Sequence, residues 1–375
     1  MPSRKTSFIP LIRPVVGKEE LEEVKEVLDS GWLAQGPKVK EFERKLEGFL
    51  GAKHVVATSS CTTALSLAID ALDLRRGTAV VVPDFTFPAT ANVVVRAGGE
   101  PLLADVDLDT FGIKPTEVLK ARGKDVSAVI PVHPFGHPFE VDEVYENAGK
   151  LGAEVIEDAA TAFLTRYKGR PVGSRGRAVC FSFHPRKLLT SAEGGCLATD
   201  DDEVYEWALA MRSHGQVRRK GKAAFVMNGL NYRMSDVHAA IGIAQLRKVR
   251  AIVARRRKQA KLYDELIADS GLDLRPPEEK GWAFHTYQSY VVLLGRAFPL
   301  RDRCVGVLRK RFGIETQVGT YSLSAQDAFR STRKLGGLPG SGKAYERSLT
   351  LPMYHSLSES QQAYVVDSLR RLSRA

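Results

Sequence analysis

The chain has 375 residues, of which 43% are hydrophobic and 26% charged, as in soluble globular proteins large enough for two domains. No apolar run approaches the ~20 residues of a membrane helix, and the N-terminal residues lack the apolar core of a secretory signal, so we expect a cytoplasmic protein without a membrane segment. The net charge of +11 comes with no interleaved aromatic residues or recognisable reader motif, which argues against nucleic-acid binding.

The first two thirds of the chain predict an α/β fold. Two helices come first, at residues 19–28 and 39–50, with an irregular stretch at 32–37 between them. Short apolar strands then alternate with helices, which implies a mostly parallel sheet covered by helices on both faces. The expected strands are 54–57, 79–82, 101–104, 126–132, 154–157, 178–183 and 194–198, and the expected helices are 62–72, 88–97 and 141–151.

The last third predicts a smaller α+β unit. A long helix is expected from residue 236 to about 270, followed by a strand at 287–294 and helices at 301–311 and 358–372. We expect the domain boundary near residue 250, with a large domain at 1–250 and a small one at 251–375. Basic residues crowd 218–222 and 247–261; attraction of a phosphorylated substrate explains such charge, and a solvated helix face is the alternative for the second cluster.

The four cysteines are far apart and lie mostly within apolar runs. They form no CxxC motif and no Cys/His cluster, so the sequence predicts no metal site. Such spacing is typical of reduced, buried thiols in a cytoplasmic protein. The four residues are Cys61, Cys180, Cys196 and Cys304.

Lys187 is the residue around which the expected chemistry is organised. It lies in a loop between the strands at 178–183 and 194–198, among apolar and small residues. A buried ammonium group loses its proton or finds a partner, and a neutral lysine amine is a nucleophile toward aldehydes. The alternative is a loop lysine whose amine reaches the solvent.

Other polar and aromatic residues lie where ligands of open sheets bind, beyond the carboxyl ends of the strands. Thr62 and Thr63 open a helix whose N-terminus could hold a phosphate, or they could belong to an ordinary helix cap. Phe87 could stack on a planar cofactor or could be a core residue. Asp158 ends a strand, where its carboxylate could pair with a protonated ring nitrogen or cap the following turn.

Together these residues match the needs of pyridoxal 5′-phosphate (PLP). Its phosphate would lie on Thr62, Thr63 and Ser182, and its ring would be covered by Phe87. Asp158 would face the pyridine nitrogen, and Lys187 would hold the aldehyde carbon. Each signal alone is weak, but the combination is specific.

Seven motifs extend this pattern along the chain: SGWLAQGP (30–37), VPDFTFPAT (82–90), PVHPFG (131–136), EDAA (157–160), FSFHPRK (181–187), EGG (193–195) and NYRMSD (231–236). With these motifs, nearly the whole chain resembles the fold-type I, PLP-dependent sugar aminotransferases of the DegT/DnrJ/EryC1/StrS family. The resemblance implies a Schiff base between PLP and Lys187, and a bond from Asp158 to the pyridinium. It also implies that Asn231 reaches the cofactor phosphate of a neighbouring subunit in a homodimer, although Asn231 could instead cap the following helix.

Three positions depart from the family pattern. Cys61 replaces a glycine in the turn before the first sheet helix, and Thr161 replaces a glutamine that normally lies near the ring hydroxyl of the cofactor. Residues 319–324 replace a histidine-containing substrate stretch. The last change bears on which substrate is used rather than on the chemistry.

The resemblance implies transfer of an amino group from glutamate or glutamine to a keto group on a nucleotide-linked deoxysugar. Three alternatives stay open: an aminotransferase acting on a keto-cyclitol, a PLP-dependent sugar dehydratase, and a regulatory relative without turnover. The dehydratases of the family carry a histidine in place of the lysine, so Lys187 argues against that activity. Cys61 and Thr161 are the features that could support the regulatory relative.

Overall fold

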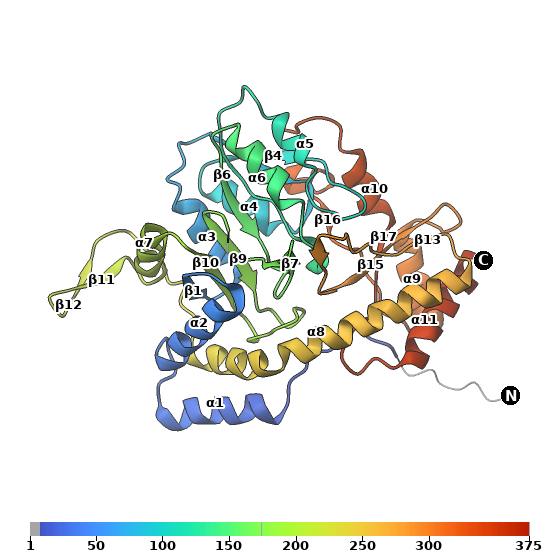
Figure 1. Cartoon of the computed structure of the whole chain (residues 1–375), viewed down its shortest axis with the longest axis horizontal. Helices are drawn as coiled ribbons and strands as arrows, with labels where there is room; N and C mark the ends of the chain where they lie inside the picture. Colours follow the sequence, from blue (N-terminus) through green and yellow to red (C-terminus); the bar gives the residue numbers. More distant parts are fainter. Residues whose placement is uncertain (1–7, 174, 375) are drawn as a thin grey trace.

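The computed structural model describes residues 8–173 and 175–374, and a seven-stranded sheet forms its centre (Figure 1). Within this sheet only β10 runs opposite to the other strands, so the expected mostly parallel sheet is confirmed. The strands lie in the order β1 (His54–Thr58), β10 (Gly195–Thr199), β9 (Ala178–Ser182), β6 (Glu154–Asp158), β5 (Val126–Val129), β2 (Ala79–Pro83) and β4 (Glu100–Ala104).

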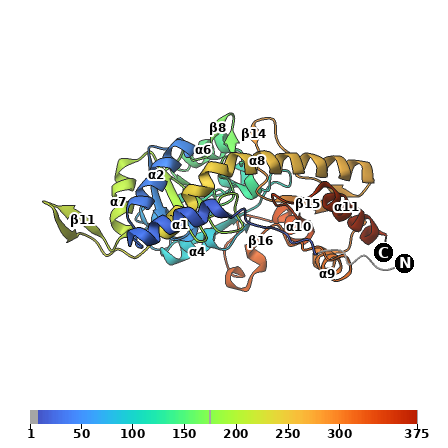
Figure 2. The same cartoon turned by 90° about the horizontal axis from the view of Figure 1, so that it is seen from below.

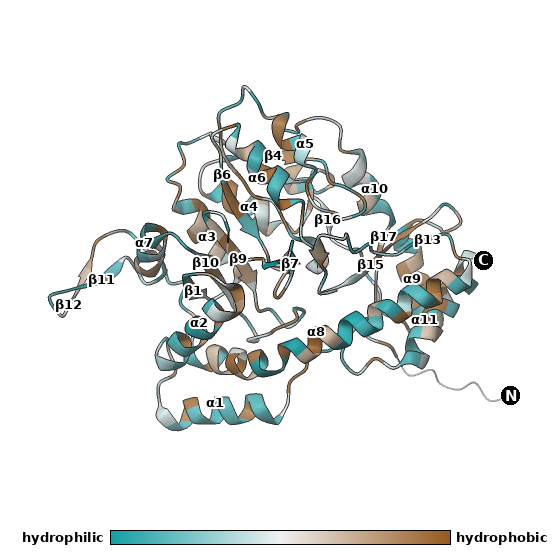
Figure 3. Cartoon of the chain, in the orientation of Figure 1, coloured by the Kyte–Doolittle hydropathy of each residue, from teal (hydrophilic) through white to brown (hydrophobic). Residues whose placement is uncertain are grey.

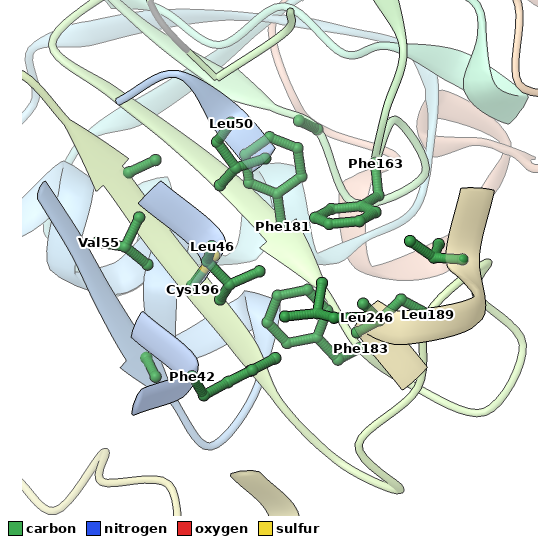
Figure 4. Close-up of a cluster of buried hydrophobic side chains, with 14 of the residues drawn as sticks. Phe42, Leu46, Leu50, Val55, Phe163, Phe181, Phe183, Leu189, Cys196 and Leu246 are labelled. Carbon is green, nitrogen blue, oxygen red and sulfur yellow. The ribbon is translucent and has the colours of Figure 1, made fainter. Parts of the chain in front are cut away.

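The sheet is buried on both faces because successive side chains of a strand point in opposite directions. On β9, Val179 and Phe181 face a core formed with α2 and α8, in which Phe181 packs edge-on against Phe163 (Figure 4). Cys180 points the other way, into a core formed with α3, α4 and α7. These helices are α2 (Pro37–Leu50), α3 (Cys61–Asp70), α4 (Ala89–Arg96), α7 (Asp202–Arg212) and α8 (Asp236–Ser270), while α5 (Pro115–Leu119) and α6 (Val141–Gly149) pack near β2, β4 and β5.

The C-terminal third forms a core of its own around a three-stranded antiparallel sheet. The helix α8 links the two regions, since it packs against α1 and α2 at one end and α11 at the other (Figures 1 and 2). The division into domains at residue 250 stays a prediction. The elements are β13 (Leu274–Arg275), β15 (Tyr290–Leu294) and β17 (Ser348–Leu351), with α9 (Arg301–Phe312), α10 (Pro339–Arg347) and α11 (Glu359–Ser373); α1 (Lys18–Ser30) precedes α2.

Two strands are each three residues shorter than expected. β5 ends at Val129, shortly before Pro131, which has no N–H for the ladder. β15 begins at Tyr290 instead of residue 287, because Tyr287 has a φ of +49° and the chain turns there toward the large sheet. Two short pairings tie the regions together. β14 (Ala283–Phe284) pairs with β7 (Arg166–Tyr167), which also pairs with β8 (Arg170–Pro171), and β16 (Tyr321–Ser322) pairs with β3 (Phe85–Thr86).

The two basic clusters have different surroundings. Residues 218–222 lie on a hairpin of β11 (Gln216–Arg219) and β12 (Lys222–Phe225) that projects from the body of the protein (Figures 1 and 2). On α8, by contrast, Arg247 and Lys248 pair with carboxylates of α1, and Arg257 pairs with Glu279. Polar residues line much of the exposed side of α8 (Figure 3).

No helix in residues 8–173 or 175–374 combines the length and apolarity needed to cross a membrane. All four cysteines are buried and free, so the expected burial is confirmed.

Candidate active site

One cavity of about 570 Å³ opens beyond the carboxyl ends of β2, β6 and β9. Its wall also includes residues of the C-terminal third, such as Gln288 and the stretch from Gln317 to Tyr321. The structure therefore gathers residues from very different parts of the chain around one space. Six of the eight predicted site residues line it: Thr62, Phe87, Asp158, Thr161, Ser182 and Lys187.

Asp158 is 4% exposed, and hydrogen-bond donors hold both of its carboxylate oxygens. Thr90 Oγ1 donates to Oδ2 at 2.7 Å, and the N–H of Ala160 donates to Oδ1 at 3.1 Å. The second bond is the turn-capping contact considered from the sequence, and the first is a tertiary contact from α4. The two bonds fix the orientation of the carboxylate at the cavity wall, where it can accept a further hydrogen bond.

Lys187 is half-buried in the loop that joins β9 to β10. The loop is closed at its base by the N–H of Phe183, which donates to the carbonyl of Gly194 at 2.8 Å. Burial lowers the pKa of Lys187, while the nearby Cys61 and Asp158 act in the opposite direction. An amine with a lowered pKa, facing a cavity, has the properties that the sequence predicts for a nucleophile or a base.

Thr62 and Thr63 have different surroundings at the start of α3. Ser60 is the N-cap, and its side chain accepts a bond from the N–H of Thr63. The hydroxyl of Thr63 lies 2.8 Å from the carbonyl of Ser60 and 3.1 Å from its N–H, within the cap, and Thr63 does not line the cavity. Of the two threonines, only Thr62 reaches the space where a phosphate would lie, so the ordinary cap considered from the sequence accounts for Thr63.

Phe87 and Thr161 both line the cavity. Phe87 is 62% exposed and its ring centroid is 6.3 Å from that of Tyr321, so it is not the core residue considered as its alternative. The hydroxyl of Thr161 donates to the carbonyl of His133 at 2.7 Å. The hydroxyl of Thr161 is therefore bound to the backbone, at the position where the family usually has the longer side chain of glutamine.

Asn231 is exposed and does not line the cavity of its own chain. The alternative role as helix cap does not hold, because Ser235 is the N-cap of α8 and accepts from the N–H of His238. The role of Asn231 toward a neighbouring subunit stays a prediction.

Sequence reasoning missed three sets of contacts that shape the cavity. Asp84, at the end of β2, accepts bonds from Ser322 Oγ and the N–H of Ser324, both at 2.7 Å, and so fixes the divergent stretch 319–324 against the large sheet. Thr90, which orients Asp158, lies in the motif 82–90, and a hydroxyl in the first turn of a helix beside a strand end could have indicated it. The contacts of Gln288 with the lysine loop had no local signal. 

The fold around this cavity is that of a PLP-dependent aminotransferase of fold type I. The model of the DegT/DnrJ/EryC1/StrS aminotransferase family matches residues 14–370, and the chain belongs to this family.

Three relatives illustrate the similarity. The spore coat polysaccharide biosynthesis protein SpsC of Bacillus subtilis is 33% identical, over 99% of this chain and 98% of SpsC. The aminotransferase TlmJ of Streptoalloteichus hindustanus is 31% identical with a TM-score of 0.90, over 97% of this chain and 98% of TlmJ. DesI, whose structure was determined in the presence of its TDP-sugar product, is 29% identical with a TM-score of 0.90, over 99% of this chain and 94% of DesI.

Proposed function

We propose that this enzyme transfers an amino group from glutamate or glutamine to the keto group of a nucleotide-linked deoxysugar. One observation carries the proposal: a single cavity joins the half-buried Lys187, the buried Asp158 and the N-terminus of α3. The TDP-sugar product of DesI supports a nucleotide-linked sugar as the acceptor. The free, buried cysteines support a reducing, cytoplasmic setting.

The donor set of the cavity fits PLP. The first-turn N–H groups of α3, with the hydroxyls of Thr62 and Ser182, suit a phosphate, since helix N-termini attract anions. The oriented carboxylate of Asp158 suits a protonated ring nitrogen, and Phe87 offers an aromatic face. When bound, PLP supplies an electron-withdrawing ring that makes the α-hydrogen of an amino donor acidic.

Lys187 then acts as the base and acid of the transfer. Its Nζ takes the proton from the donor α-carbon and later returns a proton to the acceptor, which a neutral amine can do. Burial lowers the pKa of this amine and so favours its neutral form near neutral pH. Asp158 would hold the proton of the ring nitrogen of bound PLP in place, because Thr90 and Ala160 prevent the carboxylate from turning away.

The enzyme is proposed to be a homodimer with shared active sites. Arg218 and Lys222 lie on the projecting hairpin and do not line the cavity of their own chain. Asn231 is likewise outside that cavity. In a dimer, Asn231 would reach the cofactor phosphate of the other subunit, and the basic hairpin would attract the diphosphate of its substrate.

The function is tested by the colour of the purified enzyme and by its substrates. We expect a visible absorbance band that bleaches when glutamate or glutamine is added, and is absent in Lys187→Ala. A panel of keto-sugar nucleotides and keto-cyclitols then identifies the acceptor by the return of the band. A colourless protein that takes up no PLP would refute the proposal. If only the keto-cyclitols are turned over, the acceptor is a keto-cyclitol and not a nucleotide-linked sugar. The divergent stretch 319–324, part of which lines the cavity, would then be the first place to look for the cause.

The shared site is tested by mixing subunits. Lys187→Ala and Asn231→Ala homodimers should each be nearly inactive, while a hybrid of the two variants should recover activity, because one of its two sites keeps both residues. No recovery in a hybrid shown to have formed would contradict the sharing of Asn231, and light scattering checks the dimer itself.

A further inference from the structure

Residues 285–289 cross from the C-terminal third to the large sheet. The N–H of Thr286 donates to the carbonyl of Gly136 at 3.0 Å, and the N–H of Ser289 donates to that of Phe135 at 3.3 Å. A side chain at Gly136 would clash with this crossing, since an added Cβ would lie 2.9 Å from the backbone N of Gln288. The crossing is therefore packed closely against the cavity wall.

Gln288 connects the crossing to the loop of the active-site lysine. Its Nε2 donates to the carbonyl of Arg186 at 2.6 Å, and Arg186 directly precedes Lys187. The side chain lines the cavity although Gln288 as a whole is only 5% exposed. Its Oε1 has no hydrogen-bond partner in the part of the chain that the structure describes. The side-chain amide of Gln288 thus leaves its oxygen without a partner while its nitrogen holds the lysine loop.

Arg256 holds Gln288 from the opposite side. Its Nη1 donates to the carbonyls of Gln288 at 2.8 Å and of Tyr287 at 3.3 Å. Arg256 lies on α8, is 4% exposed, and forms no ion pair with any described carboxylate. Burial lowers its pKa to about 10, so it stays charged at neutral pH and its bonds to the carbonyls are charge-assisted.

Arg186 is held a second time from the C-terminal third. Its Nη1 donates to Oε1 of Gln317 at 3.2 Å. Gln317 itself is fixed by the N–H of Thr350, on β17, which donates to its carbonyl at 2.7 Å. The residue before the active-site lysine is therefore bound through both its backbone and its side chain.

We propose that Gln288, supported by Arg256, is a positioning residue that holds the backbone of the lysine loop so that the amine of Lys187 faces the reacting atoms. The inference rests on the proposed function and deepens it. It makes the C-terminal third, through α8 and residues 285–289, part of the machinery that aligns the lysine. A misplacement of about 1 Å in such a group lowers rates by as much as roughly 100-fold.

The test is Gln288→Met, which keeps the length of the side chain and removes the N–H donor. We expect kcat to fall about tenfold while the KM of the amino donor changes by less than about twofold. A loosened loop also lets water reach the amine, which favours its charged form. The pH at which PLP adds to the cofactor-free full chain at half its maximal rate should therefore rise by about half a unit. The other groups that act on this amine, Cys61, Asp158 and Arg186, are unchanged in the variant.

Gln259 provides a matched control. It is 2% exposed, its Nε2 donates to the carbonyls of Tyr354 and Leu357 at 2.9 and 3.1 Å, and its Oε1 also lacks a partner among the described residues. Gln259→Met removes the same kind of bond from the C-terminal third without touching the lysine loop. It should lower Tm by a similar amount and leave kcat and the pH midpoint as in the wild type.

A second variant covers the case in which Gln288→Met does not fold. Gln317→Met loosens Arg186 through its side chain and should shift the same pH midpoint in the same direction by a smaller amount. The inference is overturned if the folded variants keep the wild-type midpoint and kcat, or if Gln259→Met changes both equally. Failure of the proposed function looks different, because the wild type itself would then show no transamination.

Discussion

The approach of α3 to β10 leaves no room for a side chain at Gly195, the glycine that lies beside the first turn of α3. An added Cβ would lie 2.7 Å from the carbonyl oxygen of Phe181, 2.5 Å from the carbonyl carbon of Ser60, and closer still to the backbone N of Cys61. Ordinary contact begins at 3.4 Å. All three obstacles are backbone atoms, so no side chain can turn aside, and the start of α3 must move away from the sheet by most of an ångström.

Gly195→Ala should therefore affect both stability and cofactor binding. Overpacking of this kind costs about 1–3 kcal/mol of unfolding free energy, which lowers Tm by about 2–4 °C per kcal/mol in a large domain. If the phosphate of PLP binds at the first turn of α3 as proposed, the displaced turn would also lose at least one charge-assisted bond to it. Such a bond contributes about 1.5–3 kcal/mol, so the Kd for PLP should rise roughly 10- to 100-fold.

The assay is titration of cofactor-free protein with PLP, followed by the visible band, together with thermal unfolding. Gly194→Ala is the neighbouring control, because its Cβ would meet the ends of two side chains, Ser191 and Met234, which can move. Gly48→Ala, in open space on α2, should raise Tm slightly through helix propensity. A Gly195→Ala protein that binds PLP as tightly as Gly194→Ala would refute the claim that this glycine places the phosphate site.

Three further predictions follow from buried polar contacts. Asp236→Asn should lower the unfolding free energy by about 1–2 kcal/mol in denaturant titration, because the Asp236 carboxylate accepts three N–H groups at the start of α2. Asp84→Ala should raise the KM of the keto acceptor about tenfold in steady-state kinetics with a smaller change for the amino donor, since it frees the bonds to Ser322 and Ser324 that fix one wall of the cavity. Burial lowers the pKa of His137 from 6.5 to about 4, so the unfolded chain binds a proton between these pH values that the folded chain does not. Stability should therefore fall by up to about 3 kcal/mol as the pH drops from 6.5 to 4, and His137→Gln should flatten that slope in urea unfolding curves.

The parallel sheet was predictable because its strands are short apolar runs with helices between them. This pattern can be recognised from the hydrophobicity of each segment alone. The positions of Lys187 and Asp158 on the cavity wall were predictable for a related reason, while their chemical roles stay predictions. A strand end in an open sheet has a known place relative to the ligand, so a reactive residue there can be assigned before any contact is seen. The same reasoning is weaker at Thr63, because the sequence alone does not show whether a hydroxyl in the first helical turn belongs to the helix cap or binds a phosphate. Only the coordinates show that its oxygen lies within the cap formed by Ser60.

Contacts that join distant parts of the chain had no signal in the sequence. Asp236 caps a helix that begins some 200 positions earlier, and Gln288 reaches a carbonyl 102 positions away. Neither contact follows from a hydrophobic pattern of period 2 or 3.6. Each forms only when α8 and the crossing at 285–289 bring the C-terminal third against the large sheet. The chemistry of this enzyme can be read from strand ends of the large sheet, whereas the precision of that chemistry depends on polar side chains of the C-terminal third. If relatives with the same lysine and aspartate differ in kcat, the cause should therefore be sought first in residues such as Gln288 and Gln317. These residues hold the lysine loop without being reactive themselves.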